Sequence, residues 1–312
     1  MIEFLAIAWL LISTLVGAFF FIKYYVQRRE SEAGLKDLKI VREIPFEDKP
    51  YVVDYLFNSR ITPKGMTATF IDLLRRKHFS MEEIPNQGMV GKLLNLKDFL
   101  FSRLESEDHL TRPEKYLLEL IFTREETRFL APKISRPVNQ ITLSEIVGIR
   151  DSSYESLYLL WKPFTEREIE TNKTKENFLD FSLSDRFSKI SIALFILNAL
   201  FSFLAFVFFK QNPVVIGFVF ASVPTLVFLA ISLFPTILCR KTKMGLEHYK
   251  EWLGLQKFFD DFGYLHDKDP EEIVLWEKFL VFGTLFGNAK KINSRFEPLF
   301  TLRKRNDNSV GS

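Results

Sequence analysis

The chain has 312 residues, of which 47% are hydrophobic and 26% are charged, and its 34 Phe residues far exceed ordinary usage. This mixture indicates very apolar blocks set among ordinary globular ones, so we predict a cytoplasmic domain joined to membrane spans rather than two soluble domains. A net charge of +3 is too small to indicate a nucleic-acid binder by itself, and the single cysteine, Cys239, excludes an intrachain disulfide framework and a cysteine-based metal cluster.

Residues 4–22 form the first predicted transmembrane helix. They carry no charge and are long enough to cross about 30 Å of hydrocarbon, and basic residues follow from Lys23 onward. The basic residues follow the apolar run, and no cleavage site precedes them, so we predict an uncleaved anchor with its N-terminus outside. Residues 23–46 are charged and are interpreted as a linker.

Residues 47–123 are predicted to form a winged-helix-like domain. Thr62 is a natural N-cap with Pro63 at the first helical position, and alternation from Phe79 predicts an edge strand. A second strand is predicted at 97–105, and Thr111 with Glu114 forms a capping box that begins a further helix. The order helix, helix, hairpin, helix is that of a winged-helix unit.

A winged helix suggests DNA binding, so the basic residues Arg75, Arg76 and Lys77 have two interpretations. They are either nucleic-acid contacts or solvated cations at a helix C-terminus, where the helix dipole favours positive charge. We favour the second interpretation, in which the domain is a protein–protein interaction module.

Residues 124–189 are predicted to be a cytoplasmic helical region. It contains a short helix near 141–148, capped by Thr142 or Ser144, and an amphipathic helix broken at Pro163.

Residues 190–209 and 214–238 are predicted to be the second and third transmembrane helices, joined as a hairpin. Pro224 and Pro235 are expected to kink the third helix. The loop between the two helices carries only Lys210, whereas five basic residues flank the other ends of the helices, so residues 23–189 and 239–312 are predicted to be cytoplasmic. No ionisable residue lies inside a span, and Asn198 is expected to serve helix packing, so the spans are interpreted as anchors rather than as a transport pathway.

Residues 239–292 are predicted to form a cytoplasmic helical pair. Its first helix is expected to continue directly from the third span, and its second is expected to begin at the N-cap Asp269. The apolar run of that second helix, 279–289, is too short to cross a bilayer, so we predict no fourth span. Its apolar surface needs cover from the preceding helix, from the winged-helix-like domain or from the lipid interface. We interpret four residues of the pair as packing or interaction residues, and Gly283 and Gly287 as a mark of close helix packing: Trp252, Trp276, Gly283 and Gly287.

Nothing in the sequence nominates catalytic chemistry, since it contains none of the common nucleotide-binding, hydrolase or metalloprotease motifs. We therefore expect no enzyme activity and no catalytic, cofactor-binding or metal-binding residue. The four histidines (His78, His109, His248 and His266) are interpreted as partly exposed polar residues, and Cys239 as a buried bystander. The acidic residues between 260 and 272 are interpreted as helix caps and a solvated turn, and residues 293–312 as a basic tail.

The chain resembles the YciQ-type family of predicted membrane proteins of unknown function. The resemblance rests on "ITPKGMTATFIDLLRRKHF" (61–79), "ITLSEI" (141–146), the aromatic hairpin, "KTKMGLEHYKEWLGLQKFFDDF" (241–262) and "DPEEIVLWEKFLVFGTLFGNAKK" (269–291). Members of that family generally carry a β-rich extracytoplasmic domain before the first span, whereas only Met1–Glu3 precede the first span predicted here. The resemblance implies no catalytic residues.

Together these features predict a mainly α-helical, multi-pass protein of the inner (cytoplasmic) membrane with an α+β cytoplasmic domain. Our first hypothesis for its function is a non-catalytic, membrane-anchored scaffold or adaptor. Its expected partners are the lipid bilayer and another membrane protein, one that supplies an extracytoplasmic domain. The alternative is a membrane-tethered nucleic-acid-binding regulator that uses Arg75, Arg76 and Lys77. The sequence indicates no small-molecule ligand.

Overall fold

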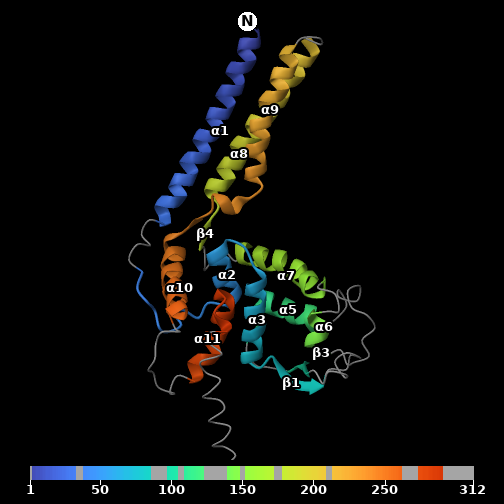
Figure 1. The fold of residues 1–312 in the computed structure, drawn as a ribbon, viewed down its shortest axis with the longest axis vertical. Coiled ribbons are helices and arrows are strands. Elements are labelled where there is room, and N and C mark those ends of the chain that lie inside the picture. The colour runs from blue at the N-terminus through green and yellow to red at the C-terminus, as the bar shows by residue number, and fades with distance from the viewer. Residues whose placement is uncertain are drawn as a thin grey trace, which may run out of the picture. The chain divides into compact units, whose positions relative to one another are not determined.

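A computed structural model describes residues 2–32, 38–85, 97–104, 109–122, 139–147, 152–171, 178–208, 213–261 and 273–290 (Figure 1). The chain divides into two compact units. Unit 1 combines Met1–Asp37 with Asn177–Glu247, and unit 2 combines Leu38–Glu176 with His248–Ser312. Each unit is therefore assembled from two stretches that lie far apart in the sequence.

Unit 1 is built on three long helices that lie side by side: α1 (Ile2–Glu32), α8 (Ser182–Phe208) and α9 (Pro213–Ser232) (Figure 1). Helix α1 packs against both α8 and α9, and α8 packs against α9. Residues 23–32, which we assigned to a linker, are helical and belong to α1. Helix α8 likewise begins at Ser182, eight residues before the predicted span.

The third predicted span ends earlier than expected. Helix α9 ends at Ser232, and Pro235 begins a short 3₁₀ helix (η3, Pro235–Ile237) instead of kinking a longer helix. Proline lacks an N–H and restricts the residue before it, so the helix stops ahead of it. The prediction that α10 (Lys243–Asp261) continues directly from the span is wrong, because η3 and strand β5 (Arg240–Lys241) lie between them. Strand β5 pairs with β4 (Leu179–Asp180).

The three helices of unit 1 meet through close packing and one hydrogen bond between polar side chains. Trp9 Nε1 donates to Asn198 Oδ1 at 2.8 Å, so Asn198 joins α8 to α1, in the packing role predicted for it. A Cβ on Gly17 would lie 2.2 Å from the Phe228 ring, so only glycine allows α1 and α9 this close approach. The core of unit 1 consists of Tyr24, Leu183, Phe187 and Leu238.

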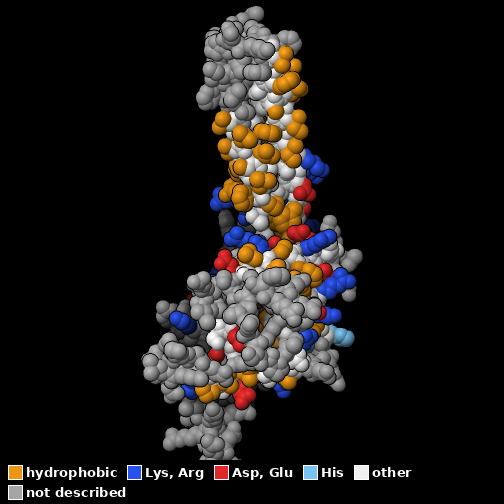
Figure 2. Space-filling view, turned by 90° about the vertical axis from the view of Figure 1, so that its right-hand side faces the viewer, with side chains coloured by type: hydrophobic (Ala, Val, Ile, Leu, Met, Phe, Trp, Pro, Cys, Tyr) orange, Lys and Arg blue, Asp and Glu red, His pale blue; other side chains and the backbone are white. Residues whose placement is uncertain are grey.

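The outer surface of these helices is apolar (Figure 2). Large hydrophobic side chains are exposed on all three helices, among them Leu15 at 67%, Ile196 at 61% and Val223 at 51%. Within the part of the chain whose side chains are described, Ser182–Leu204 is long and apolar enough to cross a membrane, with a mean hydropathy of 1.9, and Val223–Ser232 is a shorter apolar helix. The count of three spans stays a prediction.

Unit 2 begins with two helices and a sheet. Helices α2 (Pro50–Asn58) and α3 (Pro63–Arg75) precede β1 (Phe79–Pro85) and β2 (Lys97–Arg103), and α5 (Arg112–Phe122) follows. Strands β1 and β2 are antiparallel, with Phe79 opposite Arg103. The predicted order helix, helix, hairpin, helix is confirmed for these elements, but a winged-helix fold is not established by it.

Two helix starts of unit 2 lie where the capping patterns predicted them, and a third uses Thr142, one of the two caps considered for it. Thr62 Oγ1 accepts from Gly65 N, and Thr111 N donates to Glu114 Oε2 at 2.7 Å while Thr111 Oγ1 accepts from Glu114 N. Thr142 and Glu145 form a further box of the same kind at α6 (Leu143–Val147). These pairs satisfy N–H groups that have no partner within the helix.

Two elements differ from the prediction. Strand β3 (Gln140–Thr142) pairs with β2 as a third strand, in the order β1-β2-β3, and its three residues are too few to show alternation. Helix α7 (Ser152–Thr171) is continuous through Pro163 and is not broken there. Both Pro163 and Leu159, whose carbonyl loses its helical partner, are exposed, so water can satisfy that carbonyl.

Helices α10 and α11 (Ile273–Phe286) follow the α8–α9 hairpin in the sequence and complete unit 2. Helix α11 packs against α3 and α2, and its Phe279 ring lies 5.4 Å from that of Phe259 in α10. Of the three covers considered for this apolar helix, the structure therefore shows two, the preceding helix and the α2–α3 region. Helix α11 has 14 residues, or roughly 21 Å, which is too short for a fourth span.

Candidate functional site

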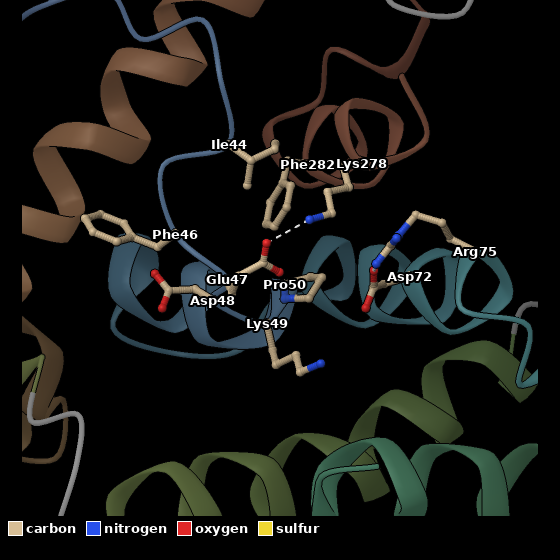
Figure 3. A pocket seen from close by; sticks show the side chains of 10 residues that line it. All are labelled: Ile44, Phe46, Glu47, Asp48, Lys49, Pro50, Asp72, Arg75, Lys278 and Phe282. Atoms are coloured by element: carbon tan, nitrogen blue, oxygen red, sulfur yellow. Dashed lines mark hydrogen bonds and ion pairs between the residues drawn. The ribbon is translucent and has the colours of Figure 1, made fainter. Parts of the chain in front are cut away.

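The described part of unit 2 has a small polar hollow where three segments meet (Figure 3). Residues 44–50, which lead into α2, form one wall, and α3 and α11 contribute the others. Acidic and basic side chains face each other across it, over an apolar base. Its lining comprises Ile44, Phe46, Glu47, Asp48, Lys49, Pro50, Asp72, Arg75, Lys278 and Phe282.

Four of the six charged side chains that line this hollow form two pairs with one another. Lys278 Nζ donates to Glu47 Oε1 at 2.9 Å, and Figure 3 shows the two side chains pointing toward each other. The hydrogen bond and the positive charge of Lys278 lower the pKa of Glu47. Arg75 Nε and Nη2 both donate to Asp72 Oδ1, at 3.0 and 2.8 Å. The hollow therefore holds matched ion pairs and has no surplus of either charge in its lining.

Asp48 fastens the segment 44–50 to α10. Its Oδ2 accepts from Trp252 Nε1 at 2.8 Å and lies 2.9 Å from His248 Nδ1. Phe46 stacks on the imidazole of His248, with ring centres 3.7 Å apart and planes 9° from parallel. We call this group, Phe46, Asp48, His248 and Trp252, the Asp48 clamp. It joins residues about 200 positions apart in the sequence.

The predicted nucleic-acid contacts are largely engaged inside unit 2. Arg76 is 8% exposed, and its Nη1 donates to Glu114 Oε1 at 2.5 Å, while Glu114 is fully buried. Arg75 binds Asp72, and only Lys77, with φ of 60° in the left-handed region, is exposed. Arg76 thus joins the end of α3 to α5, whereas Arg75 is paired within α3, and one of the three cations, Lys77, is left exposed.

A second buried carboxylate, Asp54, holds the turn between α2 and α3. Its oxygens accept from Thr62 N at 2.5 Å, from Thr62 Oγ1 at 2.9 Å and from Asn58 Nδ2 at 2.8 Å. Gly65 is required beside it, because a Cβ there would lie 2.1 Å from Asp54 Oδ2. Burial raises the pKa of Asp54 to about 6, although the hydrogen bonds from Thr62 and Asn58 act in the opposite direction.

Glu166 of α7 supports the same turn from the other side. Its Oε1 accepts from Ile61 N at 2.8 Å, one residue before the bond from Thr62 N to Asp54. Burial raises the pKa of Glu166 as well. Two carboxylates from different helices therefore hold consecutive backbone N–H groups at the start of α3.

The predicted packing residues have different fates. Trp252 is fully buried in the Asp48 clamp and packs on Phe282, with ring centres 4.4 Å apart. The side chain of Trp276 lies outside the described residues. Interpreting Gly283 and Gly287 as a close-packing pair is wrong for Gly287, which follows the last residue of α11 and has φ of 86°. This position ends the helix, where glycine adopts the left-handed conformation without strain.

One histidine differs from the interpretation of the histidines as partly exposed polar residues. His78 is buried at 3% exposure, with Nε2 lying 3.0 Å from Arg76 Nη2. Since arginine can only donate, His78 Nε2 accepts this bond. His248 is engaged in the Asp48 clamp through its contacts with Asp48 and Phe46. Cys239 is buried, as predicted. Asp269, Pro270 and the basic tail lie outside the described residues.

The contacts described above hold segments of unit 2 together. In the described ranges of the chain, no group of three or more His, Cys, Asp or Glu residues is placed to hold a metal ion. The residues that form the joints, namely Asp48, Asp54, Glu166 and Lys278, were not predicted from the sequence. The proximity of Asp54 to Thr62 could have been found, since both flank one short turn, whereas the Asp48 clamp has no local pattern.

Comparisons with known proteins identify a family, but no individual curated protein or solved structure matches. A search of curated proteins and a search of solved structures each found no match to the chain. The profile of one family, described as "Predicted membrane protein (DUF2207) C-terminal domain", matches residues 37–296. This range includes the α8–α9 hairpin and most of unit 2. The chain therefore belongs to this family of membrane proteins of unknown function, as the resemblance in its sequence indicated.

Proposed function

We propose that this protein is a three-span membrane anchor that carries a non-catalytic adaptor domain on the cytoplasmic side. In this proposal α1, α8 and α9 cross the bilayer, and unit 2 binds another membrane protein.

Unit 2 is built from chain segments that precede and follow the α8–α9 hairpin, which supports a hairpin that crosses the membrane and returns. Residues before α8 and residues after α9 pack together in this one unit, for example through Glu47 and Lys278. A folded unit lies on one side of a membrane, so the intervening chain crosses an even number of times. The apolar side chains exposed on α8 and α9 favour two crossings over none.

One surface of unit 2 supports protein binding. Helix α7 buries Leu157 and Trp161 but exposes Leu159 at 60%, Leu160 at 37% and Phe164 at 37%. Leu160 and Phe164 are four positions apart and share one face of α7, and Leu159 is adjacent to Leu160, so the three form one partly exposed apolar patch. Phe164 also contacts the Tyr116 ring of α5, with ring centres 4.4 Å apart. A clustered apolar patch on the surface of a domain is typical of an interaction site. This patch is the observation that carries the adaptor proposal.

The described side chains favour an adaptor over a nucleic-acid-binding regulator. Arg75 and Arg76 are held by Asp72 and Glu114, and a protein that binds phosphates needs cations that can reach them. Lys77 alone would supply little of the charge that such binding requires.

Cysteine labelling tests the topology. In a Cys239→Ala background, single cysteines are placed at Lys77, Lys210 and Glu277 and treated in intact cells with a membrane-impermeant maleimide. We expect labelling at position 210 alone, and labelling at 77 and 277 only after permeabilisation. Labelling of positions 77 and 210 from the same side would contradict the hairpin.

Photocrosslinking tests the adaptor role. A photoreactive phenylalanine analogue replaces Leu159 in the full chain, with a second version at Lys77 as a control on the exposed surface. We expect position 159, and not position 77, to crosslink to a membrane protein with an extracytoplasmic domain, and Leu159→Gln to weaken its co-purification. Crosslinks to nucleic acid alone, from position 77, would replace the adaptor with the tethered regulator.

A further inference from the structure

Exposed cations lie near the end of the unit 1 helices that we propose to be cytoplasmic, at a level along the helix axes that aromatic contacts define. The Phe21 and Phe187 rings lie 5.7 Å apart, and the Phe187 and Phe228 rings lie 6.3 Å apart. These contacts show that Phe21, Phe187 and Phe228 lie at about the same level along the axes of α1, α8 and α9. Heights of other residues follow from the rise of roughly 1.5 Å per residue along a helix.

Three exposed cations lie within about 3 Å of this level along the helix axes: Lys23 is two residues from Phe21, and Arg186 and Lys189 are one and two residues from Phe187. We call Lys23, Arg186 and Lys189 the basic collar. Arg186 and Lys189 are three positions apart and share one face of α8. Asp185 is the exposed carboxylate beside them in the described part of α8, so positive charge is in excess here.

Two neighbouring arginines instead form internal contacts that hold the chain in place. Arg28 Nη1 donates to Ile237 O at 2.6 Å, and Arg240 Nε and Nη2 both contact Asp180 Oδ2, at 2.8 and 2.7 Å. The collar side chains have no ion pair of this kind with the described residues. Arg28 and Arg240 thus have structural contacts, whereas the collar cations face solvent.

Exposed apolar side chains of α1 and α8 lie next to the collar, on the side of the proposed hydrocarbon layer. Phe19, which is 61% exposed, lies two residues before Phe21, and Ile192, which is 44% exposed, lies five residues after Phe187, or roughly 3 and 8 Å along the helices. Figure 2 shows Lys and Arg side chains, with some Asp and Glu among them, at the lower end of the apolar helical surface. Cations with exposed apolar groups directly on their membrane side match the two parts of a phospholipid, its phosphate and its acyl chains.

We propose that the basic collar binds the headgroups of anionic phospholipids, whose acyl chains contact Phe19 and Ile192. This inference rests on the proposed membrane insertion of unit 1. It assigns the collar a ligand class, an anionic glycerophospholipid such as phosphatidylglycerol, rather than a role in topology alone. Long Lys and Arg side chains reach the headgroup layer while their stems lie along apolar surface.

The experiment measures which lipids the full chain retains. The protein is reconstituted with equal parts of phosphatidylcholine and phosphatidylglycerol, returned to neutral detergent, and its bound lipids are counted by native mass spectrometry. We expect the retained phosphatidylglycerol to exceed phosphatidylcholine by about fivefold or more, from electrostatic attraction at several cations. Retention of both lipids in their input ratio by the unmodified chain would overturn the inference without any variant.

Variants assign the preference to residues. The triple variant Lys23→Gln, Arg186→Gln, Lys189→Gln should retain the two lipids in nearly equal amounts. A matched variant removes three exposed cations of unit 2 instead, by Lys64→Gln, Lys77→Gln and Lys115→Gln, and should keep the preference. Equal loss in both triple variants would show a general charge effect and reject the collar.

Two further measurements distinguish a lipid ligand from soluble phosphate and test membrane insertion by itself. Excess inorganic phosphate should displace little phosphatidylglycerol, and full displacement would assign the collar to soluble phosphate compounds. Carbonate extraction of native membranes tests the insertion. A chain released by carbonate would reject the membrane anchor, whereas a chain that stays in the membrane without lipid preference would reject the collar alone.

Discussion

Individual residues of unit 2 show how buried charge is used to hold turns. Asp54 is 1% exposed and accepts three hydrogen bonds from the turn that it faces, and Glu166 accepts the next N–H along the chain. Removing such a group leaves several donors without partners, so its structural value exceeds that of a surface ion pair. Position 65 of α3 requires glycine, because any side chain there would occupy the space of the Asp54 carboxylate.

The first prediction concerns Asp54 and pH. Its pKa rises from 3.8 to about 6 on folding because of burial, so the folded chain binds this proton more tightly than the unfolded chain. The contribution of Asp54 to stability is therefore present below pH 4 and is lost as the pH rises through about 6. By linkage the loss is about 3 kcal/mol.

Thermal unfolding of the full chain in detergent between pH 4 and pH 7 measures this dependence. Asp54→Asn should flatten it over that range, whereas Glu82→Gln, an exposed change on β1, should leave it intact. An unchanged slope in Asp54→Asn would show that Asp54 does not titrate there.

At the level of elements, unit 2 is joined by short local caps and by one long-range clamp. The caps at Thr62, Thr111 and Thr142 each involve residues three positions apart. Sequence patterns predicted the first two, and they narrowed the third to Thr142 or Ser144. The Asp48 clamp instead brings α10 against the segment before α2. Nothing near Asp48 in the sequence indicates Trp252 as its partner, because the contact depends on how the chain folds back after the hairpin.

The second prediction compares two neighbouring acids of this segment. Asp48→Ala leaves the N–H of fully buried Trp252 without an acceptor and should lower the free energy of unfolding by about 1–3 kcal/mol. Glu47→Ala removes an ion pair whose glutamate side chain is 89% exposed, and it should cost much less.

Melting temperature in detergent and hydrogen exchange at α10 measure the two effects. Faster exchange in α10 is expected for Asp48→Ala only. Equal destabilisation by the two changes would mean that the clamp does not hold α10.

At the scale of the whole molecule, unit 2 depends on both sides of the hairpin. Helix α11 contributes the buried residues Phe279, Val281, Phe282 and Leu285, and it packs against α2 and α3. A part of the chain synthesised after α9 therefore completes a core begun before α8. The hairpin does not interrupt this domain, since its two ends return to the same unit.

The third prediction tests this shared core. Phe279→Ala should destabilise unit 2 by about 3–5 kcal/mol, because Phe279 is 1% exposed and packs on Phe258 and Phe259. Limited proteolysis should then cut faster within α2 and α3, which lie about 200 residues earlier. Leu159→Ala, at a position 60% exposed, is the control and should leave these sites protected. Faster cutting confined to α10 and α11 would show that the two halves are independent.

Local sequence was sufficient to predict the apolar helices, the capped helix starts, the shortness of α11 and membership of a membrane protein family. These features depend on residues a few positions apart, whose geometry is set by backbone hydrogen bonding and helix period. The folded chain was needed to show that Arg75 and Arg76 are held by acids, that Gly287 ends a helix and that Asp48 holds Trp252. Whether a charged side chain is buried or paired depends on the distant segments that surround it in the fold. The residues next to it in the sequence do not determine those neighbours.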